Sequence, residues 1–341
     1  MTAAPRVVVD GRPLAGSRTG IGVHTAEILK RLRLDPPPVV GSHVEIRDRG
    51  GMEHCHFHMR RYPAGVLWQQ LHLPFIPGDV VWGPHGTLPI ALRKPAVVTV
   101  HDFSSITMAG RHEIKTLLSF NLFIARSLRM AKRVAAVSHA TAAEAMRIFG
   151  IAASKIEIVP NGVDEFFSPG GGEGDYLLYA GTLEPRKGID LLLQAWQGLP
   201  EPRPRLVLCG RAGWRTPVLP REGVELTGFV PREKLRELYR GALAFVYPSR
   251  HEGFGIPPLE AMACGAPVIA TRTGAIPEYA AGAAVLIEPS DGGALAAALR
   301  RVTGDAGLRA ELRALGPGRA ALYRWDDSAR RMADLLRAVW V

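Results

Sequence analysis

Short runs of apolar, β-branched residues recur along the chain and alternate with segments of helical periodicity. The runs contain few polar positions, which is typical of strands buried on both faces of a parallel sheet. Between them, apolar residues recur three and four positions apart, as at Ile28, Leu29 and Leu32 within 22–33. We therefore predict an α/β protein. The predicted strands are 6–10, 79–84, 96–102, 133–138, 176–181, 205–210, 243–249 and 267–271, and further predicted helices are 189–199 and 232–242.

A glycine-rich segment divides this pattern into two halves. Residues 166–175 read FFSPGGGEGD, a composition typical of an interdomain linker. We predict two doubly wound, Rossmann-like domains that face a central cleft. The first domain spans 1–167, the linker 168–175 and the second domain 176–321. The amphipathic end of the chain, about 322–341, is predicted to be a helix that packs back on the first domain.

Composition adds a basic charge to this picture. The chain has 341 residues, with 42 Lys and Arg against 32 Asp and Glu and a net charge of +10. This balance favours acidic partners such as phosphorylated ligands, anionic membrane or nucleic acid, although biased residue usage alone would also produce it. Three cysteines lie far apart, which favours a reducing compartment. With no signal peptide and no run of about 18 apolar residues, we expect a cytoplasmic protein.

The most informative stretch is HEGFGIPPLEAMACGAPVIAT at 251–271. Gly253 and Gly255 allow backbone N–H groups to approach a ligand, and the helix that follows presents partial positive charge, which suits phosphate. A carboxylate only accepts hydrogen bonds, so Glu252 and Glu260 suit a hydroxyl-rich ligand such as a ribose or a hexose. Taken singly, Glu252 is better explained as a solvated loop residue and Glu260 as a helix-dipole partner, whereas the two together within this glycine-proline frame favour a binding site.

This stretch closely resembles the E-x7-E motif of retaining glycosyltransferases with the GT-B fold, specifically family four. The family string EGFG-x-P-x-LEAMA-x-G-x-PV is matched almost without gaps, and the resemblance runs from Val7 to Leu336. It implies a metal-independent enzyme of polysaccharide biosynthesis that transfers a hexose from a nucleotide-diphosphate sugar with retention. The segment GTLEPRKG favours GDP-mannose as donor. The implied acceptor is a glycan, a glycolipid or a small molecule.

The resemblance also implies roles for individual residues in both halves. Glu252 would face the donor hexose, and Glu260 would bind the ribose hydroxyls. Arg186 and Lys187 would hold the leaving diphosphate, since arginine suits bidentate phosphate contact and lysine acts as a point charge. The implied catalytic residues are Glu252, His101, Arg186 and Lys187, the donor-binding residues are Gly20, Gly22, Thr182, Gly210, Val230, Gly253, Phe254, Gly255 and Glu260, and the acceptor contact is Asp102.

Two further motifs leave alternatives open. If HCHFH is a strand, His54, His56 and His58 share one face and are able to bind a metal ion. Transferases of this fold generally need no metal, so we predict no metal site and no required cofactor. The basic amphipathic segment 115–134 either packs its apolar face into the first domain or touches anionic lipid at the inner membrane face.

Other functions are compatible with the same motifs. A GT-B sugar phosphorylase, a nucleotide-sugar epimerase and a non-catalytic sugar-nucleotide-binding partner of another transferase all remain alternatives. The basic charge alone would also fit a nucleic-acid binder. No recognition motif or aromatic stacking platform supports that function, so we predict no nucleic-acid partner.

Overall fold

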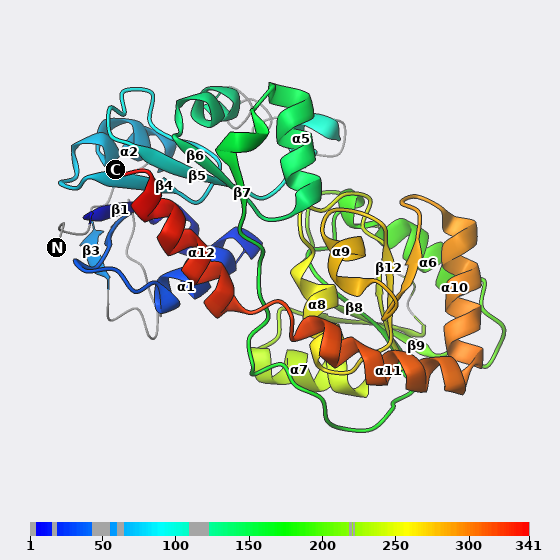
Figure 1. Ribbon diagram of the computed structural model, residues 1–341. Coiled ribbons are helices and arrows are strands. Elements are labelled where there is room, and N and C mark those ends of the chain that lie inside the picture. Colours follow the sequence, from blue (N-terminus) through cyan, green and yellow to red (C-terminus); the bar gives the residue numbers. More distant parts are fainter. Residues whose placement is uncertain are drawn as a thin grey trace. The chain divides into compact units, whose positions relative to one another are not determined.

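The computed structural model describes residues 5–15, 19–42, 55–59, 65–108, 123–217, 220 and 222–340. These residues form two α/β units (Figure 1). The first unit holds the chain up to Thr107, the stretch that ends at Gly162, and the C-terminal segment from Trp325. The second unit holds Val163–Arg324. The boundary thus precedes the predicted linker, and residues 168–175 contain no helix or strand.

A parallel sheet of seven strands forms the centre of the first unit. Its strands are β1 (Val7–Asp10), β2 (Val39–Ser42), β3 (His56–Met59), β4 (Val80–Gly83), β5 (Ala96–Val100), β6 (Arg133–Ala136) and β7 (Ile156–Ile158). Their order is β3-β2-β1-β4-β5-β6-β7, so the order reverses between β1 and β4. In doubly wound sheets, ligands bind beside the carboxyl ends of the strands at such a reversal.

Helices cover this sheet, and both ends of the chain contribute to them. The helices are α1 (Gly20–Arg31), α2 (Gly65–Leu71), α3 (Ser104–Thr107), α5 (His139–Phe149) and α12 (Trp325–Ala338), with single turns η1 (Arg12–Leu14), η2 (Leu73–Phe75) and η4 (Ala153–Lys155). The C-terminal helix α12 packs beside α1 (Figure 1). Its amphipathic pattern explains this placement, because Met332 and Leu336 are fully buried.

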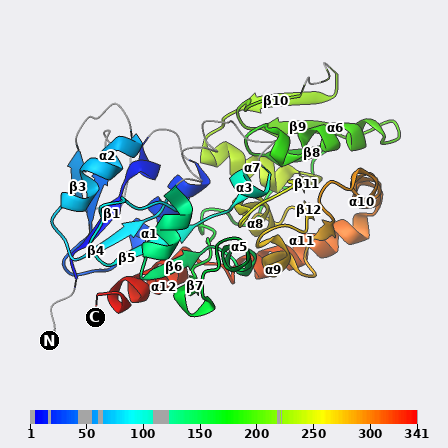
Figure 2. The same ribbon diagram turned by 90° about the horizontal axis from the view of Figure 1, so that it is seen from above.

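The second unit repeats the same strand order in a parallel sheet of six strands (Figure 2). The strands are β8 (Tyr176–Ala180), β9 (Arg205–Cys209), β10 (Val224–Gly228), β11 (Ala244–Tyr247), β12 (Val268–Thr271) and β13 (Val285–Ile287). The helices are α6 (Ile189–Gln197), α7 (Arg232–Gly241), α8 (Ile256–Ala263), α9 (Ile276–Ala280), α10 (Gly292–Gly304) and α11 (Ala306–Ala320), with the turn η5 (Pro185–Lys187). Helix α6 packs with α10, and α8 packs with α11.

The two sheets confirm the predicted α/β class. Every strand predicted from an apolar run is present, with small shifts at the ends. The predicted helices 22–33, 189–199 and 232–242 correspond to α1, α6 and α7. Residues 123–130 of the predicted segment 115–134 are helical, and its first residues lie outside the described part of the chain. Among the described residues, no helix combines the length and hydropathy needed to cross a bilayer.

Candidate functional site

The centre of the second sheet brings two loops together. Strands β8 and β11 are neighbours, and the strand order reverses between them. The loop after β8 leads through η5 into α6, and the loop after β11 leads into α8. The basic residues of the first loop and Glu252 of the second therefore meet at the carboxyl edge of the sheet, where ligands bind in this topology.

Gly188 allows the close approach of these loops. Its φ is +71°, and a Cβ atom at this position would lie 2.2 Å from the carbonyl oxygen of Pro248. Any side chain would therefore push η5 away from the end of β11 as well as strain the backbone. The glycine places Lys187 directly against the segment that carries Glu252.

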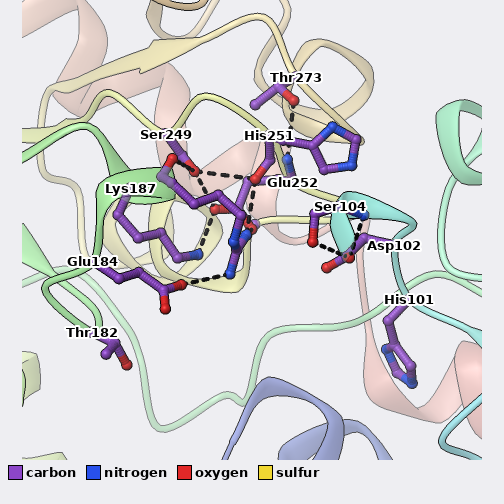
Figure 3. A network of polar contacts seen from close by, with 12 residues as sticks. His101, Asp102, Ser104, Thr182, Glu184, Lys187, Ser249, His251, Glu252 and Thr273 are labelled. Carbon is purple, nitrogen blue, oxygen red and sulfur yellow. Dashed lines mark hydrogen bonds and ion pairs between the residues drawn. The ribbon is translucent and has the colours of Figure 1, made fainter. Parts of the chain in front are cut away.

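One carboxylate oxygen of Glu252 accepts three hydrogen bonds (Figure 3). Its Oε1 atom accepts from Lys187 Nζ at 2.5 Å, from Ser249 Oγ at 2.6 Å and from the Tyr247 hydroxyl at 3.0 Å. The Tyr247 hydroxyl also accepts from Lys187 Nζ at 2.9 Å. The second oxygen, Oε2, lies 3.7 Å from Nη1 of Arg186. The carboxylate thus lies beside two cations, and Oε2 has fewer polar contacts than Oε1.

These contacts decide the protonation of the buried cluster. Burial raises the pKa of Glu252, but the charges of Lys187 and Arg186 and the hydrogen bonds to Oε1 outweigh it, so the pKa lies below its ordinary value. Burial, and then the charge of Arg186, lower the pKa of Lys187. Arg186 also binds Glu184 Oε1 at 2.9 Å and the carbonyl oxygen of His251 at 2.9 Å. Glu252 is therefore ionised and held in place.

The segment after β12 fixes the backbone of the Glu252 loop. The N–H of Glu252 donates to Thr273 Oγ1 at 3.0 Å, and the N–H of Ala275 donates to the carbonyl oxygen of Gly253 at 3.1 Å. On the other side of the loop, the Tyr279 hydroxyl donates to the carbonyl oxygen of Gly255 at 2.7 Å. These three hydrogen bonds therefore fix the shape of the loop.

Glu260 occupies a different environment within the same motif. It lies in α8, which starts directly after the left-handed Gly255. Burial raises its pKa to about 7, although a hydrogen bond from the Tyr239 hydroxyl and the charge of Arg232 act in the opposite direction. That hydrogen bond reaches Oε2 over 3.1 Å. The two glutamates therefore differ in charge state near neutral pH, one ionised and one close to its midpoint.

The other predicted donor-binding residues of this unit lie on loops at the same edge of the sheet. Thr182 is exposed after β8, and its carbonyl oxygen accepts from the Tyr179 hydroxyl at 3.1 Å. Gly210 follows β9, and its N–H donates to the carbonyl oxygen of Gly228 at 2.9 Å. Val230 follows β10 and is partly exposed. Phe254 is buried against Tyr279, with ring centres 5.5 Å apart.

In the first unit, His101 lies at the end of β5 in a neutral form. Its Nε2 atom is 2.9 Å from the carbonyl oxygen of Pro84, which only accepts, so Nε2 carries the proton and Nδ1 is an acceptor. Burial lowers its pKa to about 4. The buried ring of His24 stands perpendicular to it at 4.8 Å, and Asn161 Oδ1 lies 2.7 Å from His24 Nδ1. His101 is therefore a neutral, firmly packed group.

Asp102 and Gly22 have structural contacts of their own, and Gly20 lies in open space. Asp102 Oδ1 accepts from the N–H and the hydroxyl of Ser104, the first residue of α3, at 3.0 and 2.6 Å (Figure 3). A Cβ atom on Gly22 would lie 2.6 Å from the carbonyl oxygen of Pro13, so this glycine allows α1 to pack on η1. Gly20 begins α1 and has open space around it.

Comparison with known proteins identifies the family. The profile described as "Glycosyltransferase Family 4" matches residues 19–165, and the profile described as "Glycosyl transferases group 1" matches residues 164–317. The O-antigen chain mannosyltransferase B of Escherichia coli is 30% identical over 374 residues, covering 94% of this chain and 97% of that protein. The chain belongs to glycosyltransferase family 4.

Solved glycosyltransferase structures share the fold of this family 4 chain. HepE of Anabaena, in complex with UDP and glucose, superimposes with a TM-score of 0.78 at 20% identity, covering 97% of this chain and 99% of that one. WaaG, a glycosyltransferase involved in lipopolysaccharide biosynthesis, gives a TM-score of 0.75 at 18% identity, again with 97% and 99% coverage. The GT-B fold predicted from the sequence is therefore confirmed.

Sequence reasoning missed several residues that hold the glycosyltransferase site. Tyr247, Ser249 and Thr273 each bond to Glu252, and none belongs to the motif itself. His24 against His101 was missed as well. Tyr247 and Ser249 end the predicted strand 243–249, so their position beside the motif was the available signal.

The histidine cluster predicted at 54–58 is only partly visible in this glycosyltransferase. His54 lies outside the described residues, while His56 and His58 are in β3. Within the described part of the chain, no group of three or more histidine, cysteine or acidic residues is arranged to hold a metal ion.

Proposed function

We propose that this glycosyltransferase transfers mannose, with retention and without a metal, from GDP-mannose to a growing glycan or a lipid-linked acceptor. The observation that carries the proposal is the buried cluster of Glu252, Lys187 and Arg186 at the reversal point of the second sheet. It combines one ionised carboxylate with two cations, which suits a sugar on one side and a leaving diphosphate on the other.

The cations supply electrostatic stabilisation where negative charge develops. As the glycosidic bond breaks, charge collects on the diphosphate, and Lys187 and Arg186 are fixed beforehand by Glu252, Glu184 and the carbonyl oxygen of His251. Groups that need no reorganisation during the reaction are the effective ones in a buried site. The N–H groups of the Gly253–Gly255 loop would complete the binding of the diphosphate.

The hydrogen bonding of Glu252 supports front-face retention. A nucleophilic carboxylate needs a charge that its surroundings stabilise weakly, yet Oε1 accepts three hydrogen bonds and both Lys187 and Arg186 stabilise the ionised form of Glu252. Glu252 would instead use Oε2 to accept from a hexose hydroxyl and so hold the sugar near the reacting carbon. In the first unit, neutral His101 keeps Nδ1 as a hydrogen-bond acceptor.

One relative supports mannose as the sugar that is transferred. The E. coli relative covers nearly the whole chain and is described as a mannosyltransferase. The structural neighbour HepE is described with UDP and glucose, but at 20% identity this likeness speaks only for the fold. The guanosine base of the proposed donor rests on the segment GTLEPRKG alone, and a uridine donor is the outcome that would revise it.

Calorimetric titration of the purified protein with GDP, UDP and ADP, in the presence of a chelator, tests the donor class. We expect GDP to bind with micromolar affinity, about −8 kcal/mol, and the other two nucleotides to bind more weakly. Tight binding of UDP instead would change the donor while keeping the enzyme class. Binding of GDP that appears only after Mg²⁺ is added would contradict metal independence.

Tyr247→Phe tests the role of the hydroxyl that bridges Lys187 and Glu252. We expect kcat to fall about tenfold with KM nearly unchanged, because one hydrogen bond to a charged group is lost. The rate is measured as the nucleotide set free when the donor is consumed. Tyr176→Phe is the matched control, since its hydroxyl donates to the carbonyl oxygen of Leu238 at 2.8 Å, away from the cluster. Equal rates in both variants would show that Tyr247 serves packing alone.

A further inference from the structure

A tyrosine of α7 binds the carboxylate of Glu260. Tyr239 lies in the last turn of this helix and is fully buried, and its hydroxyl donates to Oε2 of Glu260 at 3.1 Å. Among the described residues, Glu260 is the only hydrogen-bond partner of this hydroxyl. The bond therefore satisfies a buried donor and also restricts the rotation of the carboxylate.

This contact leaves part of the carboxylate available to a ligand. Oε1 of Glu260 accepts no hydrogen bond from the residues that the structure describes, and Oε2 keeps one of its two lone pairs. The side chain of Glu260 is partly exposed, whereas Tyr239 is buried behind it. The two hydroxyls of a ribose need two acceptor positions of this kind, and the bond from Tyr239 sets their direction.

Two aromatic rings pack against the ring of Tyr239. Phe245 of β11 lies at 5.3 Å and Phe167 at 6.0 Å between ring centres, and both contacts are edge-to-face. Such contacts restrict a ring beyond what burial alone does. Phe245 belongs to the sheet, whereas Phe167 belongs to residues 163–169, which precede β8 and which we call the connecting segment.

Arginines of α7 hold the connecting segment on this helix. Arg232, Arg236 and Arg240 recur at intervals of four residues, so they lie along one side of α7. The guanidinium groups of Arg232 and Arg236 lie 4.9 and 4.3 Å from the ring centre of Phe166. Arg240 Nε donates to the carbonyl oxygen of Ser168 at 2.8 Å. The connecting segment is therefore fastened to the same helix that carries the tyrosine.

We propose that Tyr239 positions Glu260 for the ribose of the donor and that Phe167 supports Tyr239 in this role. Tyr239 would fix the orientation in which Glu260 accepts both ribose hydroxyls, without touching the nucleotide itself. The inference rests on the proposed function, since it takes Glu260 as the ribose-binding residue. It adds a route by which the connecting segment affects the affinity for the donor.

The same hydrogen bond bears on the charge of Glu260. The groups that face this carboxyl are Tyr239 and Arg232 of α7, Asp164 of the connecting segment and Cys264 directly after α8. Burial raises the pKa of Glu260 to about 7, and the hydrogen bond from Tyr239 is the largest of the influences that lower it. Loss of the hydroxyl should raise this pKa further, because the ionised form loses a donor.

Calorimetric titration of Tyr239→Phe with GDP, or with UDP if the wild type prefers it, tests the positioning role. We expect the variant to bind about tenfold more weakly at pH 8, because a hydrogen bond that orients a charged acceptor is lost. The loss of affinity on acidification should begin at a higher pH than in the wild type. Tyr176→Phe is the matched control, since its hydroxyl donates to the carbonyl oxygen of Leu238.

Phe167→Leu tests the support from the connecting segment. This change keeps an apolar side chain but removes the ring that packs on Tyr239. We expect it to weaken nucleotide binding about threefold in the wild type and to have no further effect in Tyr239→Phe, because coupled residues are not additive. An equal loss in both backgrounds would show that Phe167 does not act through the tyrosine.

Thermal unfolding tests the hydrogen bond without any ligand. A buried carboxyl whose pKa is raised by folding destabilises the protein increasingly as the pH rises through that pKa. The loss of stability between pH 5 and pH 9 should therefore be larger in Tyr239→Phe than in the wild type, and unchanged in Tyr176→Phe. In a Glu260→Gln background, Tyr239→Phe should leave the pH dependence as it is.

The two measurements distinguish failure of the inference from failure of the proposed function. An unchanged pH dependence of unfolding in Tyr239→Phe would overturn the inference, and so would equal nucleotide affinity in this variant and the wild type. If the wild type binds none of GDP, UDP and ADP, the proposed function fails and the role in ribose binding fails with it. The unfolding measurement then shows whether Tyr239 still acts on Glu260.

Discussion

Lys187→Ala should lower turnover by about 100- to 1000-fold, the range seen when one preorganised charge-stabilising donor is removed from an active site. The reason lies in the position of the ammonium group, which is buried and bonded to both Glu252 and Tyr247. If it stabilises the departing diphosphate, the loss falls mainly on kcat. The measurement is steady-state release of nucleotide from the donor that calorimetry identifies.

The same variant should change the pH dependence of the reaction. In the wild type, the charge of Lys187 is the largest of the influences that lower the pKa of Glu252 against the effect of burial. Without the lysine, burial is less compensated and the pKa of Glu252 rises. The acid limb of the pH–rate profile should therefore move to higher pH in Lys187→Ala, since the carboxylate protonates sooner as the pH falls.

Arg250→Ala is the control for Lys187→Ala, because it also removes a buried cation from these loops. Arg250 pairs with Asp190 through two hydrogen bonds of 2.8 and 2.6 Å, and no hydrogen bond or ion pair in the described part of the chain joins it to Glu252. We expect a lower unfolding temperature but a much smaller loss of kcat. If both variants lose activity equally, Lys187 acts by holding the loops together and not on the diphosphate.

Most of the strands that the apolar runs did not predict share a physical feature. Four of the five, β3, β7, β10 and β13, are the edges of the two sheets. An edge strand is covered by only one neighbour, so it needs no continuous apolar run, and β10 indeed contains two exposed residues, Glu225 and Leu226. Apolar periodicity identifies the centre of a doubly wound sheet and fails at its borders.

The candidate site was predictable in its motif residues and not in their partners. A run of adjacent residues such as EGFG carries its own signal. The bond from Lys187 to Glu252 joins residues 65 positions apart, and the bond from Thr273 to Glu252 joins residues 21 positions apart. Such contacts arise from strand order, which a single sequence reveals only after the fold is known.

Composition alone also does not distinguish the two glutamates of the motif. Glu252 is buried with two cations beside it, whereas Glu260 is partly buried with one hydroxyl within hydrogen-bond distance and a weaker influence from Arg232. The outcome is opposite shifts of pKa from the same side chain. This difference leads to the second large prediction, which concerns Glu260.

Glu260→Gln should stabilise the protein without ligand at pH 8 and weaken nucleotide binding. Because the pKa of Glu260 is raised from 4.5 to about 7 in the folded protein, the buried carboxylate costs nothing below pH 4.5. The cost grows between pH 4.5 and 7 and reaches about 3 kcal/mol above that. Glutamine has the same size and no charge, so the variant avoids most of this cost.

Thermal unfolding at pH 5 and pH 8 measures the stability difference. We expect Glu260→Gln to unfold at a higher temperature than the wild type at pH 8 and at nearly the same temperature at pH 5. Glu233→Gln is the control, because Glu233 is exposed in α7 and its replacement should leave the pH dependence unchanged. A variant that is less stable than the wild type at pH 8 would show that the carboxylate is well compensated in its buried position.

Nucleotide binding should require the ionised form of Glu260, the form that lowers the stability of the protein without ligand. If Glu260 accepts hydrogen bonds from both ribose hydroxyls, it binds in the ionised form, so the affinity of the wild type for its nucleotide should fall as the pH drops below about 7. Glu260→Gln should bind about 10- to 100-fold more weakly and lose this pH dependence, because a charged acceptor is replaced by a neutral amide. Calorimetry at several pH values distinguishes the cases. Unchanged affinity in Glu260→Gln would show that Glu260 does not bind the ribose. A variant that is more stable than the wild type but no longer binds nucleotide would show that the charge of Glu260 lowers stability and is needed to bind the donor.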